Sequence, residues 1–224
     1  MKFIIYILSI KNCERRLHVE QLTNKLLEKG FFVEIVDAIY WKECDVLHIL
    51  KEMKIELGNS NISKSQIACF LTHRKAWEII SRKDTDTDNI HIIIEDDVDI
   101  SDDCCINSLE KVYESIEQKD YDSIFLYKHP EQVNPNNEIY NDYLLKYYFQ
   151  WGFVAYSIST EFAKELYDSI RYVDLPVDDQ IHNRIFQKKK ERIFFTIKDY
   201  FKNIGFLGGY KHYGDYIFKS TIWQ

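Results

Sequence analysis

The residues with the clearest chemical potential in this sequence are three consecutive acids, Glu95, Asp96 and Asp97. They follow the apolar run Ile92–Ile94, which is typical of a strand buried on both faces. Because side chains alternate along an extended segment, Glu95 and Asp97 are expected to point one way and Asp96 the other. Unpaired buried carboxylates are costly to desolvate, and a divalent cation with oxygen ligands would relieve that cost. The alternative is an acidic loop that faces water.

Two further pairs of charged residues could take part in the same chemistry. Asp178 and Asp179 lie at a predicted helix start, where the helix dipole favours negative charge, so they could cap the helix or act in catalysis. Arg15 and Arg16 follow the first predicted strand. Their planar guanidinium groups could bind a diphosphate or belong to a solvated helix face.

Single aromatic and imidazole side chains are weaker signals. His73 lies in a predicted helix with Trp77 one turn later, and it could be a hydrogen-bonded packing residue or a ligand. Trp151 could stack on a sugar ring or pack in the core. The chain has no P-loop, G-x-G-x-x-G, G-x-S-x-G or H-E-x-x-H pattern, so nothing supports a redox-cofactor, serine-hydrolase or zinc-protease function.

Predicted strands and helices alternate along the chain. Gly30 lies where the C-cap of the first helix is expected, and Ser63 with Gln66 fits a capping box. This order predicts one α/β domain, 1–224, with a mostly parallel sheet flanked by helices, whose strand ends are the usual place for nucleotides and sugars. The strands are predicted at 2–8, 31–36, 91–95, 123–126, 153–158 and 193–197, and the helices at 14–29, 42–53, 63–82, 106–118, 160–170 and 178–186.

Composition excludes several classes of protein. Hydrophobic residues make up 46% of the chain, which excludes intrinsic disorder as its main state. A net charge of -7 argues against general nucleic-acid binding. The five cysteines form no C-x-x-C pair, which predicts reduced thiols in a cytoplasmic protein. Because no apolar stretch is long enough to span a bilayer, we expect at most a peripheral membrane contact. The run Lys188–Lys190 with Arg192 could touch anionic lipid or an anionic glycan, or form a solvated helix end.

Four blocks of the sequence stand out in this order: Tyr6–Ile10 with Glu14–Arg16, Ser65–His73 with Ala76 and Trp77, Ile92–Val98, and Ala155–Ser159 followed by Pro176–Asp179. Together they resemble glycosyltransferase family 25, which includes bacterial lipooligosaccharide galactosyltransferases. The resemblance covers residues 3–185, whereas the tail, 199–224, matches no part of the family pattern. Gln66, Ala68 and Thr72 stand where the family usually has Glu, Gly and Ser, which are small changes in a packed helix.

The resemblance implies a GT-A-like (Rossmann-like) fold, a nucleotide-sugar donor and a divalent cation, usually Mn²⁺ and otherwise Mg²⁺. Glu95 and Asp97 would then bind the cation as the family's counterpart of a D-x-D element, with His212 of the tail as a further ligand. Family members of this type invert the anomeric centre. That reaction needs a general base, for which Asp178 or Asp179 is the candidate.

The expected reaction transfers a hexose, first of all galactose from UDP-galactose, to a glycan acceptor such as lipooligosaccharide. Two alternatives stay open, namely a two-carboxylate glycoside hydrolase and a non-catalytic nucleotide-sugar-binding protein of the same fold. The sequence does not indicate the oligomeric state. The expected donor contacts are Ser9, Arg15, Arg16, His73 and Asp96, and the expected substrate contacts are Gln150, Trp151 and Gly152.

Overall fold

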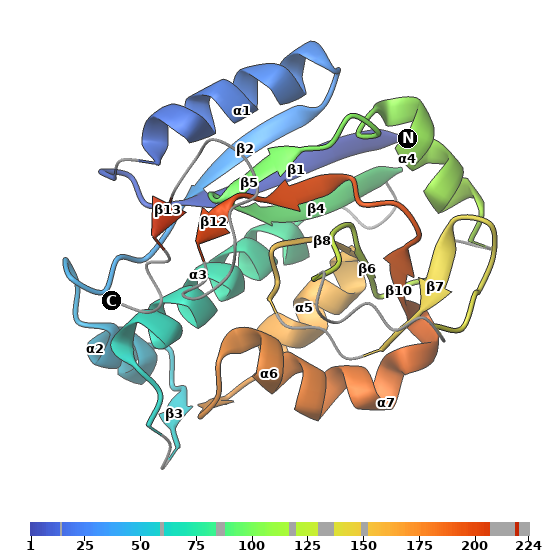
Figure 1. Ribbon diagram of the computed structural model, residues 1–224. Coiled ribbons are helices and arrows are strands. Elements are labelled where there is room, and N and C mark those ends of the chain that lie inside the picture. The colour runs from blue at the N-terminus through green and yellow to red at the C-terminus, as the bar shows by residue number, and fades with distance from the viewer. Residues whose placement is uncertain are drawn as a thin grey trace.

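Strands and helices alternate along most of the chain, as the spacing of apolar residues predicts (Figure 1). The computed structural model describes residues 1–13, 15–58, 61–83, 88–116, 120–129, 137–148, 152–206 and 218–219. The strands of the main sheet are β1 (Lys2–Ser9), β2 (Phe32–Asp37), β4 (Asn89–Glu95), β6 (Ser123–Phe125), β7 (Leu144–Lys146), β8 (Ala155–Ile158) and β10 (Ile193–Thr196). The helices are α1 (Arg16–Glu28), α2 (Val46–Glu52), α3 (Lys64–Ser81), α4 (Ile106–Glu114), α5 (Thr160–Ser169), α6 (Val177–Ile181) and α7 (Gln187–Lys189).

These seven strands form one sheet in the order β2-β1-β4-β8-β6-β10-β7. Strand β1 pairs in parallel with β2 and β4, and β6 pairs in parallel with β10. Strands β8 and β7 run antiparallel to their neighbours, so five of the seven strands point the same way. The structure confirms the predicted mostly parallel α/β sheet flanked by helices.

Each face of the sheet carries its own hydrophobic core. Alternate residues of β1, such as Tyr6 and Ile7, enter opposite cores because successive side chains point to opposite faces. One core packs against α2, α3, α5 and α6, and the other against α1 and α4 (Figure 1). The continuous apolar runs in β1 and β4 are therefore explained by burial on both faces.

Two predicted helix boundaries are confirmed in atomic detail. The backbone N–H of Ser63 donates to Gln66 Oε1 at 2.9 Å, and the N–H of Gln66 donates to Ser63 Oγ at 3.2 Å, which forms the capping box of α3. Gly30 follows α1 with a φ of +89°, a conformation that favours glycine. These caps fix where α1 and α3 begin or end.

Several short elements were not predicted. They are β7, α7, a 3-10 turn (Lys190–Arg192), β3 (Glu56–Leu57), β5 (Val98–Ile100), β9 (Tyr172–Val173), β11 (Phe201–Asn203), β12 (Gly205–Phe206) and β13 (Phe218–Lys219). The predicted helix 178–186 is present as α6 followed by a π-helical turn (His182–Phe186). The strands β3 with β9, β5 with β11, and β12 with β13 form separate two-stranded sheets. Each strand of these small sheets is only two or three residues long, which is too short to show a period of apolar residues.

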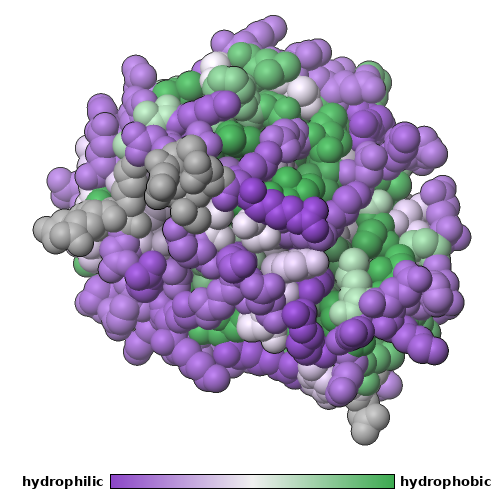
Figure 2. Space-filling view, turned by 180° about the vertical axis from the view of Figure 1, so that it is seen from behind, coloured by the Kyte–Doolittle hydropathy of each residue, from purple (hydrophilic) through white to green (hydrophobic). Residues whose placement is uncertain are grey.

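The surface gives no sign of a membrane-spanning segment in the described residues. None of their helices combines the length and apolar character that crossing a bilayer requires. The face seen in Figure 2 is largely hydrophilic, and polar side chains interrupt its apolar areas. All five cysteines lie in the described residues and are unpaired.

Candidate active site

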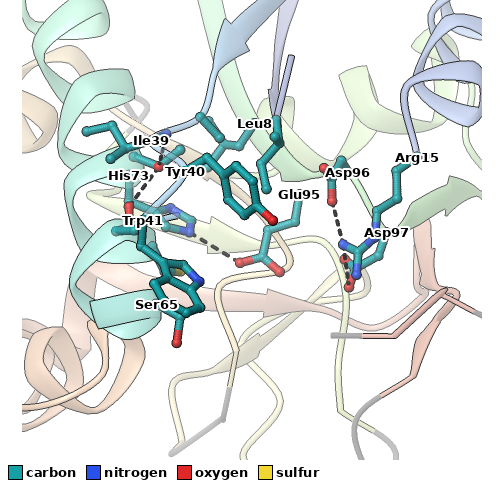
Figure 3. Close-up of a pocket in the computed structure, with 15 residues that line it drawn as sticks. Leu8, Arg15, Ile39, Tyr40, Trp41, Ser65, His73, Glu95, Asp96 and Asp97 are labelled. Carbon is teal, nitrogen blue, oxygen red and sulfur yellow. Dashed lines mark hydrogen bonds and ion pairs between the residues drawn. The ribbon is translucent and has the colours of Figure 1, made fainter. Parts of the chain in front are cut away.

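A pocket lies at the carboxyl ends of β1, β2 and β4, three neighbouring parallel strands (Figure 3). In an open α/β sheet, this edge is the usual place for ligands. One face of α3 closes the side of the pocket. The residues that line it are Leu8, Ile10, Arg15, Ala38, Ile39, Tyr40, Trp41, Ser65, Ala68, Cys69, Thr72, His73, Glu95, Asp96 and Asp97.

The direction of Glu95 follows from the pleat of β4. Ile93 enters the core on the α3 side of the sheet, and Glu95, two residues later, faces the same side. There its Oε1 atom lies 3.3 Å from Nε2 of His73, which α3 holds almost fully buried. The predicted orientation of Glu95 away from Asp96 therefore agrees with the structure.

Asp97 does not join Glu95 on that side as expected. Strand β4 ends at Glu95, and Asp96 and Asp97 form a turn in which side chains no longer alternate. Nη1 of Arg15 lies 2.6 Å from Asp96 Oδ1 and 3.6 Å from Asp97 Oδ2 (Figure 3). Both aspartates therefore share one buried arginine, a contact that the strand pattern could not predict.

The negative charges of the acids at this turn are only partly balanced by Arg15. Burial and the nearby charge of Glu95 raise the pKa of Asp97 to about 7, despite Arg15. Burial also raises the pKa of Asp96, although Arg15 opposes the change. The Oδ1 atom of Asp97 is buried and has no hydrogen-bond partner among the described residues. Oxygen donors with surplus negative charge and one orphaned carboxylate oxygen fit a hard divalent cation.

A second possible set of ligands lies in the same pocket. One ligand atom each from Cys69, His73 and Glu95 lies within 4.8 Å of the other two. Burial and then Glu95, Asp178 and the two other acids raise the pKa of the Cys69 thiol well above its usual value. Cys69 and His73 share a face of α3 because they are four residues apart.

Two of the predicted donor contacts lie outside the pocket lining. Ser9 ends β1 in the interior, and its hydroxyl group donates to the carbonyl oxygen of Ile10 at 3.4 Å. Arg16 lies with Nη1 3.9 Å from Asp37 Oδ1, beyond the end of β2. Arg15, His73 and Asp96 do line the pocket, and each is engaged by a protein partner there.

The two acids near residue 178 have different surroundings. Both lie in the first turn of α6. Asp178 Oδ2 accepts a hydrogen bond of 2.7 Å from the backbone N–H of Gly152, whose φ is +79°. Asp178 also lies close enough to the pocket to raise the pKa of Cys69, whereas burial followed by Asp178 raises the pKa of Asp179. Gln150, Trp151 and His212 lie outside the described residues.

Sequence reasoning missed the aromatic wall of the pocket. Tyr40 and Trp41 follow β2, and the buried Nε1 atom of Trp41 has no hydrogen-bond partner in the part of the chain that the structure describes. Their segment is held by Thr72, whose Oγ1 accepts from the N–H of Ile39 at 3.0 Å and donates to the carbonyl oxygen of Ala68 at 2.8 Å. The sequence did contain a signal for this wall, because Tyr40 and Trp41 are adjacent aromatic residues just beyond a predicted strand.

Comparisons with known proteins point to one family of enzymes. A family model described as "Glycosyltransferase family 25 (LPS biosynthesis protein)" matches residues 3–181. No curated protein matches the chain. One similar solved structure is described as a "glycosyltransferase involved in the glycosylation of the major capsid of PBCV-1". It is 10% identical, with a TM-score of 0.46, and the match covers 87% of this chain and 82% of that one.

Proposed function

The chain belongs to glycosyltransferase family 25, and we propose that it transfers a hexose from a nucleotide-sugar donor to a glycan acceptor. UDP-galactose is the first donor to test and lipooligosaccharide the first acceptor. The observation that supports this proposal most is the turn after β4, where three acids and one arginine meet in a pocket at the ends of parallel strands. This arrangement suits a ligand that combines phosphates with a cation.

The cation proposed here is Mn²⁺ or Mg²⁺. Glu95 and Asp97 would hold it from different sides, because both line the pocket although they do not face the same way. Support comes from the orphaned Oδ1 atom of Asp97 and from the surplus of acids over cations around it. When bound, such an ion supplies positive charge that stabilises a departing nucleoside diphosphate. Arg15 keeps Asp96 and Asp97 in place through its contacts with both.

Asp178 is the proposed general base of an inverting transfer. In that reaction the acceptor oxygen bonds to the anomeric carbon, the bond to the diphosphate breaks with its electrons leaving on the nucleotide, and Asp178 takes the acceptor proton. Its electrostatic effect on Cys69 supports a position near the pocket, and the hydrogen bond from Gly152 orients its carboxylate. Asp179 is the comparison residue, because it shares the first turn of α6.

Tyr40 and Trp41 are the proposed contacts for the nucleotide base. They follow β2 and line the pocket, where an aromatic ring can stack on a base, and the N–H of Trp41 has no hydrogen-bond partner among the described residues. A cytoplasmic location is also proposed, and the unpaired cysteines fit it. A peripheral membrane contact remains a separate proposal, with anionic vesicles as its probe.

Release of UDP tests the proposed function directly. The purified protein is mixed with Mn²⁺ and a panel of UDP-sugars, with and without EDTA, and both UDP release and nucleotide binding are measured. We expect slow, EDTA-sensitive release of UDP from one donor even without acceptor. Cleavage of a glycoside without any nucleotide would instead favour a hydrolase, and tight donor binding without transfer to any acceptor would favour a binding protein. Absence of both turnover and binding across the panel would overturn the proposal.

A further inference from the structure

We propose that His73 is a positioning residue that holds Glu95 by donating a hydrogen bond from Nε2, and that Trp77 and Tyr156 force it to do so. The role of Glu95 as a cation ligand rests on the proposed function. The position of the proton on the His73 ring does not rest on the proposed function, because it can be measured on the protein without a cation or substrate. Trp77, Tyr156, His73 and Glu95 form a row of four hydrogen-bonded side chains that runs from the core to the pocket.

The hydrogen bonds between these four side chains are continuous, and three of the four side chains are almost completely buried. Nε1 of Trp77 donates to the hydroxyl oxygen of Tyr156 at 2.9 Å, and this hydroxyl group lies 3.0 Å from Nδ1 of His73. Nε2 of His73 lies 3.3 Å from Oε1 of Glu95. Trp77, Tyr156 and His73 are each at most 1% exposed. Because α3 supplies two members and β8 and β4 one each, the row links three elements.

The direction of every hydrogen bond follows from the first donor. An indole N–H can only donate, so the Tyr156 oxygen accepts from Trp77. The hydroxyl proton of Tyr156 then has Nδ1 of His73 as its acceptor, since these two side chains are the hydroxyl group's partners within the described residues. A neutral imidazole that accepts at Nδ1 carries its proton on Nε2. That proton points at the carboxylate of Glu95.

A proton on Nε2 also argues against His73 as a ligand of a thiophilic metal. Cys69, His73 and Glu95 lie close enough to bind one, but ligation would require an unprotonated Nε2. The ring proton would then move to Nδ1, and the Tyr156 oxygen would face two donors. Its own hydroxyl proton would be buried with no acceptor among the described residues, which is unfavourable.

The consequence for the site is a fixed Glu95. Its carboxylate is only partly buried, so without the contact to His73 it could rotate toward water. Residues that orient a metal ligand typically change metal affinity or activity by about 10- to 100-fold when they are removed. We expect a loss of metal affinity of that size when the hydrogen bond from His73 to Glu95 is removed. Removing the hydroxyl group of Tyr156 should cause a loss near the lower end of that range.

The first experiment observes the ring of His73 in the metal-free protein. Selective ¹⁵N labelling of the seven histidines, with His73→Gln to assign the signal, reports which ring nitrogen carries the proton. We expect a proton on Nε2 and an unprotonated Nδ1. A proton on Nδ1 would overturn the proposal, whether or not the protein has transferase activity.

The second experiment measures Mn²⁺ affinity by electron paramagnetic resonance. Glutamine places an N–H near the position of Nε2, whereas asparagine reaches only the position of Nδ1. His73→Gln should therefore retain Mn²⁺ affinity to within about threefold, and His73→Asn should lose about 10- to 100-fold. Equal losses in the two variants would overturn the proposal. If the wild-type protein binds no Mn²⁺, the proposed cation fails, and the ring spectrum alone decides the role of His73.

Tyr6 provides a matched control for Tyr156. Its hydroxyl group lies 3.1 Å from Nδ1 of His91 in the same core, away from the pocket lining. Tyr156→Phe should weaken Mn²⁺ binding by about tenfold, while Tyr6→Phe should lower stability similarly and leave binding unchanged. Finally, Co²⁺ should give no thiolate charge-transfer band. Such a band, lost in Cys69→Ser, would show metal ligation in place of positioning and would overturn the proposal.

Discussion

Replacing Asp97 with asparagine should stabilise the cation-free protein and abolish cation-dependent turnover. Asp97 is buried, and its Oδ1 atom has no hydrogen-bond partner among the described residues. Burial and the charge of Glu95 raise the pKa of Asp97 from 3.8 to about 7. Near neutral pH and above it, the folded protein therefore carries a carboxylate that would be more stable in the unfolded chain.

The magnitude follows from the difference between the two pKa values. At about 1.36 kcal/mol per pKa unit, the change from 3.8 to about 7 corresponds to about 4 kcal/mol of unfolding free energy. The amide of asparagine leaves an N–H without an acceptor where Oδ1 now lies, which costs about 1–3 kcal/mol. The substitution should therefore raise the free energy of unfolding by about 1–3 kcal/mol above neutral pH.

The sign of the pH dependence is also fixed. Because the folded pKa of Asp97 is raised, its contribution to stability is fully present below pH 3.8 and is lost as the pH rises through about 7. Between about pH 5 and about pH 8, the wild-type protein should lose about 2–3 kcal/mol relative to Asp97→Asn.

Urea unfolding in EDTA at those two pH values measures this difference. Asp99→Asn is the control, because it removes the same charge from a partly exposed pair with Lys25, at 3.0 Å, that should contribute little. A variant no more stable than the wild type at the higher pH, with the same dependence on pH, would refute the electrostatic argument. Mn²⁺-dependent UDP release by Asp97→Asn would refute the role proposed for this residue.

Three further substitutions test the site and its frame. Asp178→Asn should lower the rate of transfer by about 10²- to 10⁴-fold and Asp179→Asn much less, as steady-state kcat values would show. Thr72→Val should cost about 1–3 kcal/mol in urea unfolding and raise the KM of the donor, because the N–H of Ile39 loses its acceptor, whereas Thr72→Ser should change neither. Ser63→Ala should lower stability by about 1 kcal/mol through loss of the α3 cap without altering the KM, measured by the same two assays.

The sequence predicts the frame of this protein better than its contacts. Apolar spacing locates the helices α1 to α6 and every strand of the main sheet except β7, and alternation along β4 correctly places Glu95 on the opposite side from Asp96. Alternation fails at Asp97, because the strand has already ended and the turn brings the side chain to Arg15. A periodic pattern carries information only where the backbone is regular, and the reactive residues lie where regularity stops.

Long-range contacts were beyond prediction for a different reason. Tyr156 meets His73 across 83 residues, and Gly152 meets Asp178 across 26 residues. No local period encodes such a pair, since it depends on which strands become neighbours in the sheet. The antiparallel insertion of β8 beside β4 is what brings Tyr156 under α3, and that order was not predicted.

Helix α3 connects these observations, because successive positions on one helix serve different parts of the pocket. Thr72 holds the segment after β2, His73 contacts Glu95, and Trp77 reaches Tyr156 one turn deeper in the core. At two positions where this chain departs from the family pattern, the structure retains a suitable hydrogen-bonding group. Threonine and serine offer the same hydroxyl group at position 72, and Gln66 completes the capping box through Oε1, as a glutamate would. Thr72→Val would remove the hydroxyl group at this position and Thr72→Ser would keep it, so the two variants together test whether the pocket requires that group.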